Sequence, residues 1–336
     1  MRKELLELDA QIVAAASVVG KKEREGPLGE KFDLCDPDGR FGRKTWEGAE
    51  SEMQRLAFNT VLAKAGMRDT DVGALFAGDL LNQCVGSAYG LLDFDVPYFG
   101  LYGACSTCAE GLLLASVMVS SDLLACCGSV TSSHYCSAER QYRMPIEYGS
   151  QRPPTAQWTA TAAGAFLVRR SVRDHKTRAV IRRALPGKVI EKGVNDANNM
   201  GAAMAPAALD TLVRFFRHTG TRPSEYDRIY TGDLGYEGGR ILCELMMLEG
   251  YEDFAAVYGD CGQMIYFKTE QDVHGGGSGC GCSAAVLAAE ILPGLLRREG
   301  LHRILFLSTG AMMSPDSIKQ GESIPAVAHL VELCRK

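Results

Sequence analysis

Apolar residues recur at steps of three and four along residues 45–66, which predicts an amphipathic helix. Thr45 stands where a side-chain oxygen can cap the first turn, and Glu47 suits the partly positive start of a helix. Gly66 follows the last periodic residue, as expected of a helix that ends in a left-handed cap. Similar patterns predict helices over residues 111–121, 204–218 and 241–248.

Short apolar runs alternate with these helices and predict buried strands. They cover residues 72–77, 98–102, 123–128 and 164–168 in the first half of the chain, and residues 228–231 and 303–308 in the second. A glycine-rich loop over residues 275–281 opens one more helix, which runs through residue 290. Alternating strands and helices of these lengths are typical of α/β proteins.

The order of motifs in the first half is repeated in the second. Residues 77–80 (AGDL) match residues 231–234 (TGDL), each at the end of an apolar strand. Residues 103–108 resemble residues 277–282, each at the start of a helix of small residues. The strand over residues 123–128 resembles the one that ends at Gly310. We therefore predict two related α/β halves, residues 1–172 and residues 173–336, with loops of unequal length.

Composition narrows the class of protein. With 46% hydrophobic and 23% charged residues, the 336-residue chain has the make-up of a folded soluble protein. Its net charge of −5 argues against a nucleic-acid binder. Its twelve cysteines are too sparse for a disulfide scaffold and lie mostly in apolar segments, which indicates free thiols in a reducing compartment.

Neither export nor membrane insertion is expected from the sequence. Residues 1–9 alternate basic, acidic and apolar side chains, so they lack the apolar core of a signal peptide. The most apolar stretch, residues 112–130, is broken by Ser120, Ser121 and Asp122.

Cys105 is the first candidate for chemistry. It stands in a Gly-Ala-Cys-Ser sequence at the start of a helix, where backbone N–H groups and the helix dipole favour a thiolate. The alternative interpretation is structural: a small residue that allows close packing.

The motifs together resemble those of a known family. The two-half layout, with a cysteine at a helix start in the first half, is similar to the thiolase fold of thiolases and ketoacyl synthases. More narrowly, the chain resembles the SpoVAD family (stage V sporulation protein AD) of spore-forming bacteria. The strings that carry this resemblance span nearly the whole chain: GPLG (26–29), AGDLLNQ (77–83), GACST (103–107), TSSH (131–134), AERQ (138–141), EYG (147–149), DANNMGAAMAP (196–206) and GGSGCGCS (276–283).

This resemblance implies a five-layered αβαβα fold and a non-catalytic protein. It implies binding of dipicolinic acid, free or as its calcium chelate, for uptake into the developing spore. The implied partners are the other proteins of the SpoVA operon. The implied location is peripheral at the spore inner membrane after synthesis in the forespore cytoplasm. A homodimer is expected because such folds commonly pair through an edge strand, and no cofactor or bound metal ion is expected.

The alternative is an active condensing enzyme in which Cys105 accepts an acyl group. Such enzymes pair the cysteine with two second-half residues, usually two histidines or a histidine and an asparagine. The corresponding loops here carry Asp233 and, approximately, Ser278 or Gly279. A carboxylate raises the pKa of a nearby thiol and cannot donate as an imidazolium would. His134 and His274 remain open as replacement bases.

For a planar dianion such as dipicolinate we expect arginines, backbone amides and aromatic walls. We place the ligand beside Cys105, with Asp79, Asn82, His134 and Asp233 around it and Arg140 as the anion partner. Arg143, Tyr142 and Tyr148 belong to the same segment. Capping and surface ion pairs remain the alternative roles of these aspartates and arginines.

A metal or redox site is the third interpretation. Cys105 and Cys108 form a C-x-x-C pair, and Cys280 and Cys282 form its second-half counterpart. Facing each other, the pairs would offer a four-thiolate zinc site or a dithiol. Cys126 and Cys127 are expected to point to opposite faces of a strand.

Overall fold

The computed structural model describes residues 4–142, 151–171, 178–297 and 300–336. The first half contains β1 (Leu6–Val19), α1 (Lys21–Arg24), β2 (Leu34–Cys35), α2 (Trp46–Ala65), β3 (Ala74–Gly78), α3 (Val85–Gly90), β4 (Tyr98–Leu101), α4 (Thr107–Ser120), β5 (Cys126–Ser133), α5 (Tyr135–Tyr142), β6 (Trp158–Thr159) and β7 (Ala162–Arg170). The second half contains β8 (Ala179–Leu185), α6 (Met200–Thr219), β9 (Arg228–Thr231), α7 (Gly235–Leu248), α8 (Phe254–Val257), β10 (Tyr258–Asp260), α9 (Cys261–Met264), β11 (Gly277–Ser278), α10 (Cys280–Val286), α11 (Leu292–Leu296), β12 (Arg303–Ala311), α12 (Pro315–Lys319) and β13 (Ala326–Arg335).

The strand order shows the duplication directly. In the first half the strands run β4-β3-β5-β7-β1, and in the second they run β10-β9-β12-β13-β8 in the corresponding places. Antiparallel pairing of β1 with β8 joins the two orders into one continuous sheet, with Ala10 opposite Ile181. The predicted duplicated α/β fold is confirmed. The predicted boundary at residues 172–173 falls outside the described residues and stays a prediction.

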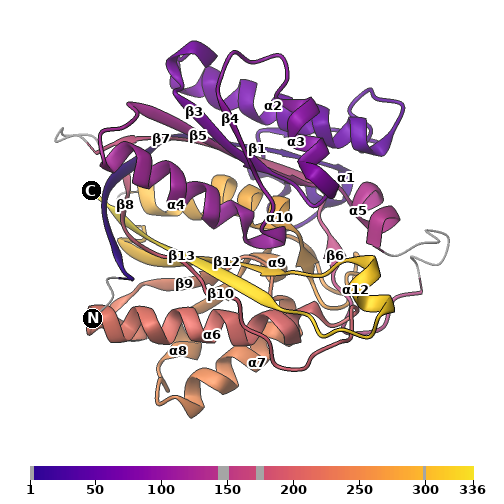
Figure 1. The fold of residues 1–336 in the computed structure, drawn as a ribbon, viewed down its shortest axis with the longest axis vertical. Helices are drawn as coiled ribbons and strands as arrows, with labels where there is room; N and C mark the ends of the chain where they lie inside the picture. Colours follow the sequence, from indigo (N-terminus) through magenta and orange to yellow (C-terminus); the bar gives the residue numbers. More distant parts are fainter. Residues whose placement is uncertain (1–3, 143–150, 172–177, 298–299) are drawn as a thin grey trace.

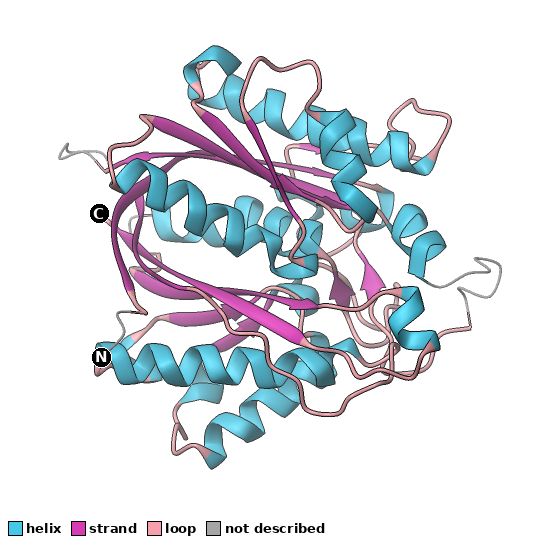
Figure 2. Cartoon of the chain, in the orientation of Figure 1, coloured by secondary structure: helices cyan, strands magenta, loops and turns pink. Residues whose placement is uncertain are grey.

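The joined sheet folds back on itself around a central layer of helices. Figure 1 shows α2 and α3 on one outer face, α4 and α10 between the two halves of the sheet, and α6, α7 and α8 on the other outer face. Figure 2 shows the same five layers by type of element. Among the described residues, no helix is long and apolar enough to cross a membrane.

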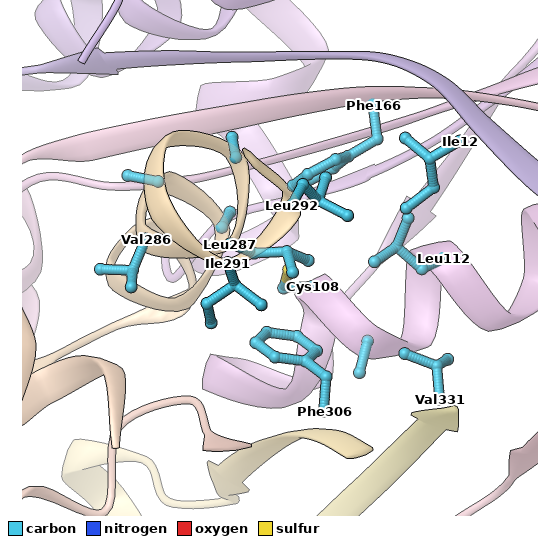
Figure 3. Close-up of a cluster of buried hydrophobic side chains, with 14 of the residues drawn as sticks. Ile12, Cys108, Leu112, Phe166, Val286, Leu287, Ile291, Leu292, Phe306 and Val331 are labelled. Carbon is cyan, nitrogen blue, oxygen red and sulfur yellow. The ribbon is translucent and has the colours of Figure 1, made fainter. Parts of the chain in front are cut away.

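The central layer contributes to a large buried hydrophobic cluster. Figure 3 shows Leu112 of α4 in one buried cluster with Phe166 of β7 and Phe306 of β12. Close approach requires small residues: a Cβ on Gly164 of β7 would lie 2.6 Å from that of Ala284 in α10. This explains why α10 consists of cysteine, glycine, serine and alanine up to its last residue, Val286.

Several predicted elements are confirmed with small shifts at their ends. The Thr45 side chain accepts a hydrogen bond from the Gly48 N–H at 3.1 Å, and Gly66 has a φ of 64°, so both ends of α2 form as predicted. The strand predicted over residues 123–128 has the wrong bounds, because β5 covers Cys126–Ser133. In its second half the Ser132 hydroxyl donates to the Glu50 carboxylate at 2.9 Å and the Ser133 hydroxyl donates to the Ala160 carbonyl at 2.7 Å.

The strands β1, β8 and β13 are absent from the sequence prediction. β1 reads LELDAQIVAAASVV, whose alanines and acidic residues give little strand signal. Cys126 and Cys127 do point to opposite faces, since they belong to separate hydrophobic clusters on the two sides of the sheet.

Truncating a central side chain tests the importance of this layer. Phe306 is fully buried, so Phe306→Ala is expected to lower the free energy of unfolding by about 3–5 kcal/mol. Leu248, which is 82% exposed, provides the control, and Leu248→Ala is expected to change it by no more than about 0.5 kcal/mol. Urea unfolding followed by circular dichroism measures both, and equal losses would contradict the central role of the layer.

Candidate functional site

Cys105 lies in a tight turn that is held by both halves of the chain. The turn Ala104–Ser106 is a 3₁₀ helix between β4 and α4, and Ala104 has a φ of 50°, in the left-handed region that L side chains rarely adopt. The Ser106 hydroxyl donates to the Gly103 carbonyl at 2.6 Å. A Cβ on Gly310 of β12 would lie 2.3 Å from that same carbonyl, so the second half presses directly on the turn.

Asp233 meets Cys105 from the second half. The aspartate follows β9 and is fully buried. Its Oδ2 accepts from the Ser278 hydroxyl at 3.1 Å and the Gly279 N–H at 2.9 Å, and its Oδ1 accepts from the Thr309 hydroxyl at 3.0 Å. The Cys105 thiol hydrogen-bonds to the same carboxylate. The duplicated Gly-Asp and glycine-loop motifs of the second half thus converge on the cysteine of the first, as predicted.

The electrostatics of this pair keep the thiol neutral. Burial, followed by the negative charge of Asp233, raises the pKa of Cys105 well above its ordinary value. Burial also raises the pKa of Asp233, although the hydrogen bond from Cys105 and the other donors oppose that shift. Because the thiolate is the nucleophilic form of cysteine, this shift disfavours the reactive form of Cys105.

A narrow pocket opens over Cys105. Its described lining residues come from both halves: Leu80, Ala104, Cys105, Ala138, Glu139, Tyr142 and Thr159 from the first, and Met200, Ser278, Ala311 and Met313 from the second. The cavity volume is about 50 Å³, room for only a few water molecules. Apart from the thiol and the Tyr142 phenol, Glu139 is the ionisable group among these residues, and it is buried.

Asp79 and Asn82 lie close to the pocket without lining it. Asp79 is fully buried and accepts from the Leu81 N–H at 2.8 Å and the Ser87 N–H at 2.7 Å. It therefore caps its own loop, as the alternative interpretation holds. Asn82 is exposed beside the pocket, where its Oδ1 accepts from the Tyr102 hydroxyl at 2.9 Å.

His134 and Arg140 point away from Cys105, contrary to the predicted arrangement. The Nε2 of His134 hydrogen-bonds to the Gly39 carbonyl at 2.8 Å, and its ring packs on Trp46. Arg140 forms an ion pair with Glu47. The reason is helical geometry, because the pocket takes Ala138, Glu139 and Tyr142 from α5, and Arg140 lies on the other side of that helix.

The remaining candidates lie elsewhere. The Nδ1 of His274 hydrogen-bonds to the Pro153 carbonyl at 3.0 Å and its Nε2 contacts Asp272 at 2.9 Å, so it does not reach Cys105. Tyr142 lines the pocket and donates to the Leu80 carbonyl at 2.9 Å. Arg143 and Tyr148 lie outside the described residues.

Sequence reasoning missed a buried acidic network next to the pocket. Glu50 of α2 accepts from the Ser132 hydroxyl at 2.9 Å and the Ser137 hydroxyl at 2.7 Å, which ties α5 to α2. Burial, together with the nearby Asp79, raises the pKa of Glu50 to about 8. The signal was present, since Glu50 and Gln54 place two polar groups four residues apart beside the apolar face of α2.

The cysteine pairs do not assemble into a zinc site. Cys280 donates its thiol hydrogen bond to the Ser132 carbonyl at 2.9 Å, while Cys108 interacts with hydroxyls that include Ser283. Within the described parts of the chain, no group of three or more histidine, cysteine, aspartate or glutamate side chains is arranged to hold a metal ion.

Sequence matches over nearly the full length of the chain show its family. The family model of stage V sporulation protein AD (SpoVAD) matches residues 2–334. The chain is 40% identical to stage V sporulation protein AD of Bacillus subtilis (strain 168) over 317 residues, which cover 94% of this chain and 91% of that protein. The chain belongs to the SpoVAD family. The recognition based on its motifs is confirmed.

Comparison with solved structures shows the fold of this SpoVAD family member independently of its sequence family. A single-residue variant of OleA from Xanthomonas campestris superimposes with a TM-score of 0.61 at 15% identity, covering 99% of this chain and all of that one. The 3-oxoacyl-(acyl carrier protein) synthase III FabH of Xanthomonas oryzae pv. oryzae gives a TM-score of 0.60 at 16% identity, covering 98% and 99%. The fold is therefore thiolase-like.

The Cys105–Asp233 contact predicts how the thiol reacts. Asp233→Asn removes the neighbouring negative charge, so the pKa of Cys105 is expected to fall. Each unit of that fall raises the thiolate fraction about tenfold, so alkylation of Cys105 at pH 8 is expected to become at least about tenfold faster. Iodoacetamide labelling with peptide mass spectrometry separates Cys105 from the exposed Cys35.

Thr309→Val is the matched control, because it removes a hydrogen bond to Asp233 without changing its charge. An alkylation rate that is equal in Asp233→Asn and in the unaltered protein would contradict the electrostatic account.

Proposed function

We propose that this SpoVAD family member binds dipicolinic acid, free or as its calcium chelate, in the Cys105 pocket and serves its uptake into the developing spore without catalysis. The observation that carries this is the pairing of Cys105 with Asp233. Binding without turnover suits a pocket whose cysteine is held as a neutral thiol.

The non-catalytic part of the proposal rests on acid–base chemistry. An acyl-transfer site needs a thiolate and a donor for the developing oxyanion. Here the partner of Cys105 is a carboxylate. It disfavours the thiolate and does not supply a donor for the oxyanion. Among the described residues that line the pocket there is no histidine. An active condensing enzyme is therefore the less favoured alternative.

Charge favours the calcium chelate as the form taken by this pocket. Free dipicolinate is a dianion, and Glu139 together with Asp233 behind the thiol would repel it. The chelate carries no net charge, and calcium accepts carboxylate and hydroxyl oxygens such as those of Glu139 and Thr159. Because the cavity is only about 50 Å³, its walls must move apart when the ligand enters.

The location and partners in this proposal follow from the family alone. We place the protein peripherally at the spore inner membrane, after synthesis in the forespore cytoplasm, acting with the other SpoVA-operon proteins. Co-purification of a tagged chain with these proteins from sporulating cells tests the assignment, and recovery of the chain alone would count against it.

Filling the pocket tests where the ligand binds. Ala138 lines the pocket from α5 and is 3% exposed, so Ala138→Leu is expected to weaken binding of the calcium chelate at least about tenfold by occluding the cavity. Arg140→Ala changes the same helix on its outer side and is expected to leave affinity unchanged. Isothermal titration calorimetry measures both. Loss of binding in Arg140→Ala alone would move the site to the opposite face of α5.

The homodimer proposed for this protein is supported by the exposed edge of the sheet. β4 ends the strand order and pairs only with β3 among the described strands, while its Phe99 is 51% exposed and the nearby Leu92 is 72% exposed. An apolar, unpaired edge strand is a natural surface for a second copy.

A charge placed on this edge is expected to separate the two copies. Phe99→Glu should shift the protein from dimer to monomer in sedimentation velocity, because both copies would bury a carboxylate. Leu248→Glu, at a more exposed position on α7, serves as the control. A monomeric unaltered protein, or a dimer that persists in Phe99→Glu, would rule out this interface.

A further inference from the structure

Arg152 is a buried arginine on the side of β6 opposite the Cys105 pocket, and some of its N–H groups are not used by the fold. The Arg152 side chain is 4% exposed, and its Nη2 donates to the Asp272 carbonyl at 2.6 Å and to the Asp272 carboxylate at 3.1 Å. Its Nε and Nη1 are buried and have no hydrogen-bond partner within the described part of the chain. Unmet N–H groups on a buried cation are costly, so the arrangement suits a guest that supplies acceptors.

A second cation stands beside Arg152. The Nζ of Lys22 lies 4.0 Å from the centroid of the Trp158 ring, and the Cζ of Arg152 lies 4.8 Å from it. Tyr135 stacks on the same indole at 3.9 Å, which fixes the ring that both cations contact. Burial, followed by repulsion from Arg152, lowers the pKa of Lys22. The indole therefore holds two like charges close together.

The nearby carboxylates offset these cations only in part, since Glu25 also pairs with Lys21 at 3.8 Å. Asp272 is 73% exposed and is shared between Arg152 and His274. Glu23, the neighbour of Lys22 in sequence, is turned into the core, where its carboxylate accepts from the Thr161 N–H at 3.0 Å and from the Tyr266 hydroxyl. The cluster is thus locally positive in a chain whose net charge is −5.

The cluster of Arg152 and Lys22 lies apart from the Cys105 pocket. Successive strand residues point to opposite faces, so Trp158 and Thr159 of β6 face different sides. Thr159 lines the Cys105 pocket, and Trp158 holds the cations. The two places share the β6–β11 pairing but have opposite electrostatic character, since Glu139 lines the first and Arg152 and Lys22 form the second.

We propose that Arg152 and Lys22 form a second binding site, which takes an oxyanion group, carboxylate or phosphate, of a small molecule. The Nε and Nη1 of Arg152 donate to the oxygens of the anion, and the Lys22 ammonium contributes charge from the edge of the Trp158 ring. Charge-assisted hydrogen bonds of this kind are the strong ones in proteins. The site does not depend on the Cys105 pocket or on the function proposed for it.

Calorimetry in metal-free buffer at pH 7 tests the site with two probes, inorganic phosphate and dipicolinate. Binding of at least one probe is expected to weaken about 10- to 100-fold in Arg152→Gln, and less in Arg152→Lys, which keeps the charge. Lys22→Gln is expected to weaken it several-fold. Lys268→Gln is the matched control, because Lys268 lies 4.1 Å over the Tyr236 ring and takes no part in the cluster.

The outcomes separate this site from the Cys105 pocket. Binding that depends on Arg152 and survives Ala138→Leu supports the second site, even if the unaltered protein binds no calcium dipicolinate and the proposed function fails. If neither probe binds, or if Arg152→Gln and Lys22→Gln bind both probes as the unaltered protein does, the second site is overturned. Thermal unfolding of the ligand-free variants checks that each is folded, and Lys22→Gln decides the matter if Arg152→Gln is not.

Discussion

The burial of two helices between two halves of one sheet is the constraint on which the rest of the structure depends. Figure 1 shows α4 and α10 between the two halves of the sheet, and the residues at their starting turns are buried. Cys105, Cys280 and Asp233 are all buried there, and desolvation penalises their charged forms. A helix start that would favour a thiolate in water therefore favours a neutral thiol here. Burial by packing thus outweighs the helix start in its effect on the pKa of Cys105.

Duplication supplied the same Gly-Asp motif twice, and the two halves use it differently. Asp79 accepts hydrogen bonds from Leu81 and Ser87 of its own loop. Asp233 reaches the glycine loop, Thr309 and the thiol of the other half. The first aspartate stabilises a loop, and the second defines the character of a pocket. Equivalent positions in a duplicated fold thus share geometry without sharing a role.

The sequence was most informative where local signals agreed with tertiary packing. The cap at Thr45 and the periodicity behind it located α2, and the repeated motifs correctly predicted that Cys105 and Asp233 lie close together. β1 escaped prediction because its partners β7 and β8 lie far away in sequence and its alanines carry no strand preference. Arg140 was misplaced because sequence proximity does not say which side of a short helix faces a pocket. The burial of Arg152 could not be predicted, since an arginine in a loop is expected to be exposed to solvent and only the tertiary fold buries it.

The abundance of buried thiols has a consequence for the lifetime of the molecule. All twelve cysteines are free and nine of them are buried. Burial raises the pKa of Cys108 and of Cys127 to about 12, so neither is a ready target for oxidants while the fold is closed. Oxidation of these buried thiols must then wait for local opening, and its rate depends on how often the packing around them opens. For a sporulation protein, long-term chemical durability becomes a property of the packing itself.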